Sequence, residues 1–143
     1  MNEYTYAELQ TGQIETFSTE VTLEMEEQFH RITGDVNPLH RDDQYAREIS
    51  GGRFQSHVTF GMLTASLYST LAGVYLPGKY SLIHSIDRIS SFNKPVFAGD
   101  VLTVTGTLTG KQDDLKLIQV AVKITNQDGK CVSKADMKIL VQK

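Results

Sequence analysis

With 143 residues, 40% of them hydrophobic, the chain has the usual size of one domain and enough apolar residues for a core. A formal net charge of -3, with lysines and arginines scattered along the sequence, gives no general attraction to nucleic acid or to an anionic membrane. A single cysteine, Cys131, excludes an internal disulfide and a thiolate zinc site, and because the opening MNEYTYAELQ lacks the blocks of a secretory signal, we expect a cytoplasmic protein.

The first predicted element is a helix over the segment LEMEEQFHRIT. Thr22 suits the N-cap of this helix, and Gly34 suits the left-handed residue just beyond its end. One face of the helix carries three apolar residues, which are Met25, Phe29 and Ile32. The sequence therefore predicts that a loop begins at Asp35.

Two further helices are expected before the composition of the chain changes. A short one covers DDQYAREI, with Asp42 or Asp43 near its start and a pair of glycines after it. A longer one runs from Met62 to about Leu71 within the segment GMLTASLYSTLAG. Because apolar residues occupy much of the circumference of this longer helix, we expect it to be buried.

Strand-forming sequence follows from Tyr80 onward. Turns separate four expected strand segments, which are YSLIHSIDRISSF, DVLTVTGTLTG, LKLIQVAVKIT and KCVSKADMKILVQ. In the second and third segments the residues on one face alternate with those on the other, as in half-buried strands. A buried helix followed by antiparallel strands predicts one α+β domain over residues 1–143, with an antiparallel sheet wrapped around that helix.

The loop TGDVNPLH places an acid and an imidazole five residues apart. Proline restricts Asn37 before it to an extended conformation, and Pro38 fixes its own backbone angle, so the loop is stiff. On such a turn Asp35 and His40 can point into one pocket and deprotonate a water held between them. The spacing alone also fits a structural role, with Asp35 bonding loop amides and His40 partly exposed.

Gly61 stands directly before the predicted buried helix. The first amides of a helix have no partner within it, so they can receive a carbonyl oxygen that gains negative charge during a reaction. A simple helix-entry turn is the alternative reading of this glycine. Ser69, inside the helix, can hydrogen-bond a loop or a bound water, or its own backbone.

The remaining histidines are weaker candidates. His30 and His84 are expected at surface or structural positions, and His57 lies nearer the presumed pocket but has no sequence neighbour that would orient it. Because no two histidines have the spacing of metal ligands, no metal site is expected.

Three segments, ITGDVNPLHRDDQYA, FGMLTASLYSTLAGVYLPGK and FNKPVFAGD, together resemble the MaoC-like hydratases, in particular the (R)-specific enoyl-CoA hydratases with a hot-dog fold. The motifs occur in matching order over roughly residues 20 to 110. The resemblance implies a hydro-lyase that reversibly hydrates a trans-2-enoyl-CoA to an (R)-3-hydroxyacyl-CoA. It also implies a homodimer, and no cofactor is expected.

By this resemblance, Asp35 and His40 form the catalytic dyad that activates water, and the backbone N–H of Gly61 binds the thioester carbonyl. The implied roles of Asn37 and Ser69 are to hold and to support the catalytic loop. Three features depart from the family pattern: Phe60 stands where many relatives carry histidine, EISGG lengthens the approach to the central helix, and the strand from 79 to 92 is about two residues longer than is typical.

These departures leave the acyl chain length and the carrier, CoA or acyl carrier protein, open. A 3-hydroxyacyl-ACP dehydratase of fatty-acid or polyketide-type synthesis would use the same dyad. A catalytically silent hot-dog domain that binds acyl thioesters would not need Asp35, His40 and Gly61 together. A hot-dog thioesterase is disfavoured, because D-x-N-P-x-H belongs to the hydratase pattern.

Overall fold

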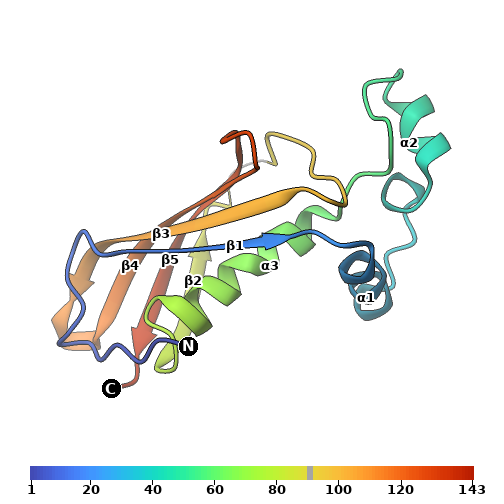
Figure 1. Ribbon diagram of the computed structural model, residues 1–143. Coiled ribbons are helices and arrows are strands. Elements are labelled where there is room, and N and C mark those ends of the chain that lie inside the picture. The colour runs from blue at the N-terminus through green and yellow to red at the C-terminus, as the bar shows by residue number, and fades with distance from the viewer. Residues whose placement is uncertain (90–91) are drawn as a thin grey trace.

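The computed structural model describes residues 1–89 and 92–143. Its five strands form one antiparallel sheet in the order β1-β3-β4-β5-β2, which makes β1 and β2 the two edges (Figure 1). The strands are β1 Ile14–Glu20, β2 Ser81–Asp87, β3 Val101–Gln112, β4 Leu117–Thr125 and β5 Cys131–Val141.

The helices gather at two places around this sheet. They are α1 Leu23–Thr33, α2 Asp43–Ile49 and α3 Gly61–Thr70, with a π-helical turn Leu71–Tyr75 continuing α3 and a short 3-10 helix, η1, at Pro38–His40. A second 3-10 turn, Asp113–Leu115, links β3 to β4. Figure 1 shows α3 lying along the sheet, while α1 and α2 lie beyond its N-terminal end, away from the two chain termini.

The core forms where α3 and its π-helical extension pack on the sheet. Leu67, Leu71 and Ala72 are buried there together with the inward residues of the three central strands. Gly106 allows the close approach, because a Cβ atom on it would lie 2.5 Å from a methyl carbon of Leu71. The predicted α+β class, an antiparallel sheet around a buried helix, is thus confirmed.

Two sequence-based expectations about the sheet were incomplete. The strand β1 was not predicted, because its polar residues and regular alternation belong to an edge strand with only one partner, β3. The segment expected as one long strand from 79 to 92 contains β2, which ends at Asp87, and residues 90–91 lie outside the described part. The predicted span of this strand is therefore wrong at its end, because Arg88 and Ile89 already lie beyond β2.

The apolar face assigned to α1 was also wrong in one position. Ile32 is 82% exposed, whereas the buried residue of this helix is Glu26, at 5% exposure. The reason is that α1 does not pack on the main core but lies beside the segment that leads into α3. His57 and Thr59 of that segment form hydrogen bonds with the Glu26 carboxylate.

Candidate functional site

The position of the loop after α1 is fixed by the end of that helix. The Thr22 hydroxyl oxygen accepts a hydrogen bond from the Met25 amide at 3.2 Å, and Gly34 ends the helix with a φ of 69°. The imidazole Nδ1 atom of His30 then lies 2.8 Å from the Asp35 carbonyl oxygen. The cap at Thr22, the left-handed Gly34 and the His30 contact together fix the position of the Asp35 backbone.

Within the loop, side-chain oxygens hold the backbone. Asp35 Oδ1 accepts a hydrogen bond from the Asn37 amide at 3.0 Å, and Asn37 Oδ1 accepts one from the Leu39 amide at 3.0 Å. Both are the local turns that aspartate and asparagine favour. Asp35 therefore does accept a hydrogen bond from a loop amide, as expected if its role were only structural. That bond uses only one of its two carboxylate oxygens.

His40 sits at the end of η1 with its ring already oriented. Its Nδ1 atom lies 2.6 Å from the carbonyl oxygen of Val58. A carbonyl oxygen only accepts, so Nδ1 carries the proton of this bond, and Nε2 is the nitrogen that remains for acid–base chemistry. The ring also packs at 4.5 Å from the ring of Phe60, which limits its rotation.

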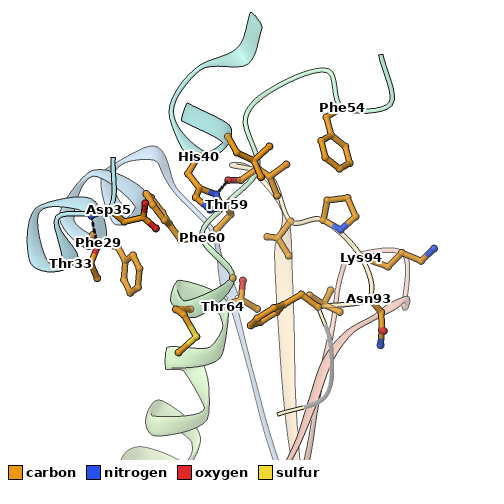
Figure 2. A pocket seen from close by; sticks show the side chains of 18 of the residues that line it. Phe29, Thr33, Asp35, His40, Phe54, Thr59, Phe60, Thr64, Asn93 and Lys94 are labelled. Carbon is orange, nitrogen blue, oxygen red and sulfur yellow. Dashed lines mark hydrogen bonds between the residues drawn. The ribbon is translucent and has the colours of Figure 1, made fainter. Parts of the chain in front are cut away.

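Asp35, His40 and Gly61 line one cavity of about 700 Å³. Asp35 and His40 lie toward one side of the cavity with Phe60 between them, and Asn93 and Lys94 lie toward the other (Figure 2). Most of the remaining wall is apolar, formed by residues such as Phe29, Leu39, Phe54, Val58, Val96 and Val132. An apolar cavity with a few convergent polar groups is the usual form of a small-molecule site.

Gly61 begins α3 at the wall of this cavity. Phe60 is the N-cap residue, and among the described residues no side chain caps the first turn. A Cβ atom on Gly61 would meet the Phe92 ring at 3.0 Å, so glycine leaves room at this helix terminus. The N-terminal amides and the positive end of the helix dipole are therefore available to an anionic oxygen.

The two supporting residues do not line the cavity. Asn37 lies in the loop and holds it through the bond to the Leu39 amide. Ser69 lies on the exposed side of α3, eight residues beyond Gly61. Its expected role toward the catalytic loop stays a prediction.

His57 was underestimated from the sequence, because its partners come from distant elements. Its Nε2 atom lies 2.9 Å from Glu26 Oε2 on α1, and its Nδ1 atom lies 2.6 Å from Asp43 Oδ1 on α2. Burial lowers the pKa of His57, but the two carboxylate partners outweigh burial, so the pKa is raised above the ordinary 6.5. The His57 backbone amide and ring lower the pKa of Asp43.

Two other classes of site receive no support from the described residues. In residues 1–89 and 92–143 no three histidine, cysteine, aspartate or glutamate side chains group as metal ligands would. Among the helices of that same part of the chain, none is both long and apolar enough to cross a bilayer.

The MaoC-like domain model matches residues 8–129, which include Asp35, His40 and Gly61. The chain belongs to the MaoC-like family. An (R)-specific enoyl-CoA hydratase of Aeromonas caviae is 36% identical over 101 residues, which cover 71% of this chain and 72% of the relative.

Solved structures of MaoC-like hydratases agree with the sequence match. The unliganded R-hydratase PhaJ1 of Pseudomonas aeruginosa has a TM-score of 0.86 at 28% identity, covering 96% of this chain and 84% of its own. The (R)-hydratase of A. caviae, described as involved in PHA biosynthesis, has a TM-score of 0.84 at 30% identity, covering 93% and 97%. The hot-dog arrangement expected from the sequence is confirmed.

Proposed function

We propose that this MaoC-like protein is a hydro-lyase that reversibly hydrates trans-2-enoyl-CoA to (R)-3-hydroxyacyl-CoA. The observation that carries the proposal is the shared cavity: a carboxylate, an imidazole and an open helix N-terminus line the same apolar space. The similarity to proteins named (R)-specific enoyl-CoA hydratase supports the same reaction.

The proposed chemistry follows from what each group can do. The thioester carbonyl docks at the N-terminus of α3, and a water lies between Asp35 and His40. The pair takes a proton from the water as its oxygen bonds to the β-carbon, and it returns a proton to the α-carbon. The electrons of the double bond pass through an enolate-like oxygen, which the Gly61 N–H and the helix dipole stabilise.

The rim of the cavity suggests how the carrier is held. Arg53 and Lys94 are exposed basic residues that line the cavity, and both fit the phosphates of CoA or of a phosphopantetheine arm. We propose CoA as the carrier. A dehydratase acting on acyl-carrier-protein thioesters would use the same dyad and is the second candidate, since these two basic residues would serve its carrier too.

We propose further that one 143-residue hot-dog domain is the catalytic unit and that it works as a cytoplasmic homodimer. Edge strand β2 supports the dimer, because it has a partner strand on one side only and carries two exposed apolar residues, Leu82 and Ile86. Such an edge is a template for pairing with a second copy. Joining two sheets there would place both side chains beside those of a second copy.

Turnover decides between an enzyme and a silent binding domain. Purified protein is mixed with crotonyl-CoA and with a longer enoyl-CoA, and the loss of enoyl-thioester absorbance is followed before chiral analysis of the product. We expect hydration to the (R)-3-hydroxyacyl-CoA by the wild type and almost none by Asp35→Asn. An (S) product, free CoA from thioester cleavage, or no turnover of either substrate would contradict the proposal.

A further inference from the structure

Glu26 is a carboxylate buried in α1 that the proposed reaction does not use. It is 5% exposed, and both of its oxygens are occupied: Oε1 accepts from the Thr59 hydroxyl at 2.5 Å, and Oε2 lies 2.9 Å from His57 Nε2. Burying a charge is costly unless it is paired and hydrogen-bonded. A buried acid at this place therefore has a specific pair of partners, and both belong to the segment that leads into α3.

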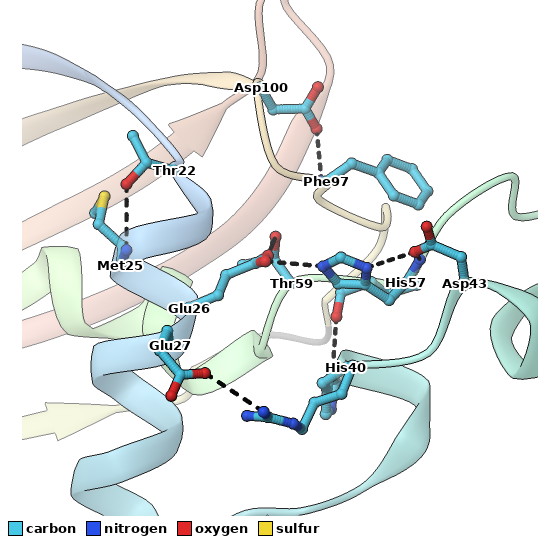
Figure 3. A network of polar contacts seen from close by, with 12 residues as sticks. Thr22, Met25, Glu26, Glu27, His40, Asp43, His57, Thr59, Phe97 and Asp100 are labelled. Atoms are coloured by element: carbon cyan, nitrogen blue, oxygen red, sulfur yellow. Dashed lines mark hydrogen bonds and ion pairs between the residues drawn. The ribbon is translucent and has the colours of Figure 1, made fainter.

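His57 extends this contact to a second helix. Its ring lies between Glu26 on α1 and Asp43 on α2, with one nitrogen toward each carboxylate (Figure 3). A neutral imidazole has one N–H, so only the protonated ring donates to both carboxylates at once. The Asp43 oxygen also accepts from the His57 backbone amide at 2.8 Å. The charged histidine thus links α1 to α2, and Asp43 is bound to both the ring and the backbone amide of His57.

Val58 lies between the two residues that Glu26 holds. Its carbonyl oxygen accepts the 2.6 Å hydrogen bond from His40 Nδ1, and its amide donates to the Leu39 carbonyl oxygen at 3.0 Å. The peptide groups on both sides of Val58 are therefore attached to η1, which carries His40. A shift of residues 57–59 would move the acceptor that orients the His40 ring.

We propose that Glu26 is a positioning residue: by holding His57 and Thr59 it fixes the Val58 carbonyl and so the orientation of the His40 imidazole. The inference rests on the proposed function, in which His40 is one half of the dyad. We call Glu26, His57, Thr59 and Val58 the clamp.

The clamp is sensitive to pH through His57. A cavity of about 300 Å³ adjoins the His57 ring. The charged or titratable groups that face the ring are Glu26 and Glu27 of α1, Asp43 of α2, His40 of η1 and Arg41, which follows η1. When His57 loses its proton, it can donate to only one carboxylate. All contacts of the clamp therefore form while His57 is protonated, and the clamp weakens as the pH rises through the raised pKa of His57.

The kinetic test uses Glu26→Gln, which keeps the shape and the acceptor for Thr59 but removes the charge opposite His57. The matched control is Glu24→Gln, an exposed acid two residues earlier on the same helix. We expect kcat for crotonyl-CoA to fall about 10-fold or more in Glu26→Gln, with KM changed less than twofold, because orientation of a catalytic group affects the chemical step. Glu24→Gln should match the wild type.

The pH profile and a double variant separate positioning from a general loss of stability. The ratio of wild-type to Glu26→Gln kcat should shrink as the pH rises, because the wild type then loses the clamp as well. Glu26→Gln combined with His57→Asn should be no slower than the slower single variant. A ratio that does not change with pH, or additive losses in the double variant, would overturn the proposal.

A readout independent of turnover is the ¹⁵N NMR spectrum of the histidine rings. In the wild type we expect His40 to be held as the Nδ1-protonated tautomer, and in Glu26→Gln we expect mixed tautomers and a lower pKa of His57. If Glu26→Gln is unfolded by circular dichroism, Thr59→Val replaces it, and the expected results are then a lower kcat and mixed tautomers of His40, because this exchange removes the Thr59 contact but keeps the charge opposite His57. Unchanged histidine signals in a folded variant would overturn the clamp, whereas an inactive wild type with the expected signals would overturn only the proposed hydratase function.

Discussion

The Nδ1 atom of His40 lies 2.6 Å from the carbonyl oxygen of Val58, a residue 18 positions further along the chain. This bond joins the loop after α1 to the segment that enters α3, where Gly61 begins the helix. It fixes one tautomer of His40 and leaves Nε2 for proton transfer. Two parts of the proposed site, the dyad and the helix terminus, are therefore connected by one short hydrogen bond.

Gly61→Val is expected to abolish most turnover while leaving the protein folded. The new side chain would fill the helix terminus where the thioester carbonyl is proposed to bind. The three described atoms nearest to its Cβ would all belong to the ring of Phe92, an exposed side chain that can move aside. We expect kcat/KM for crotonyl-CoA to fall by about 10²-fold or more, the usual loss for an oxyanion donor. A folded variant, by circular dichroism and thermal melting, with unchanged kinetics would remove Gly61 from the site.

His57 should make stability depend on pH near neutrality. Because its folded pKa is raised above the ordinary 6.5, its contribution is fully present below about pH 6.5 and is lost as the pH rises through the folded value. The wild type should therefore exceed His57→Gln in urea midpoint more at about pH 6 than at about pH 9. An equal difference in urea midpoint at both pH values would contradict a raised pKa of His57 in the folded protein.

Charge reversal at Lys94 tests the proposed binding of CoA at the rim. We expect Lys94→Glu to raise KM for crotonyl-CoA about fivefold, because a single exposed ionic contact contributes about 1 kcal/mol at most. KM for a crotonyl thioester of N-acetylcysteamine, which lacks the phosphates, should stay the same. Equal effects on both substrates would place the role of Lys94 elsewhere than at the carrier.

The exposed face of edge strand β2 is expected to be the dimer contact. Leu82→Glu should shift the protein toward monomer in analytical ultracentrifugation at micromolar concentration, because it places a charge in an apolar contact. Ile14→Glu makes the same kind of exchange on the opposite edge, β1, and should leave the dimer intact. A wild-type monomer with full activity at that concentration would contradict the homodimer.

Local patterns predicted the elements that hold the site, and long-range contacts explain what they missed. Thr22 and Gly34 cap α1 as expected, and Asp42, one of the two candidates near the start of α2, caps that helix, because a cap depends on residues within one turn. The partners of His57 could not be predicted in this way, since Glu26 is 31 residues away and Asp43 is 14. The apolar Ile32 suggested a buried face of α1, whereas pairing with His57 and Thr59 buried an acid instead.

The measurement that tests the shared-water mechanism most directly is hydration of crotonyl-CoA by Asp35→Asn, His40→Gln and the double variant, each checked for folding by circular dichroism. We predict that each single substitution lowers kcat by roughly 10²- to 10⁴-fold, the range for losing a general acid or base. The double variant should be scarcely slower than the poorer single one, because both residues serve one step. Near wild-type kcat in either folded single variant would contradict the mechanism.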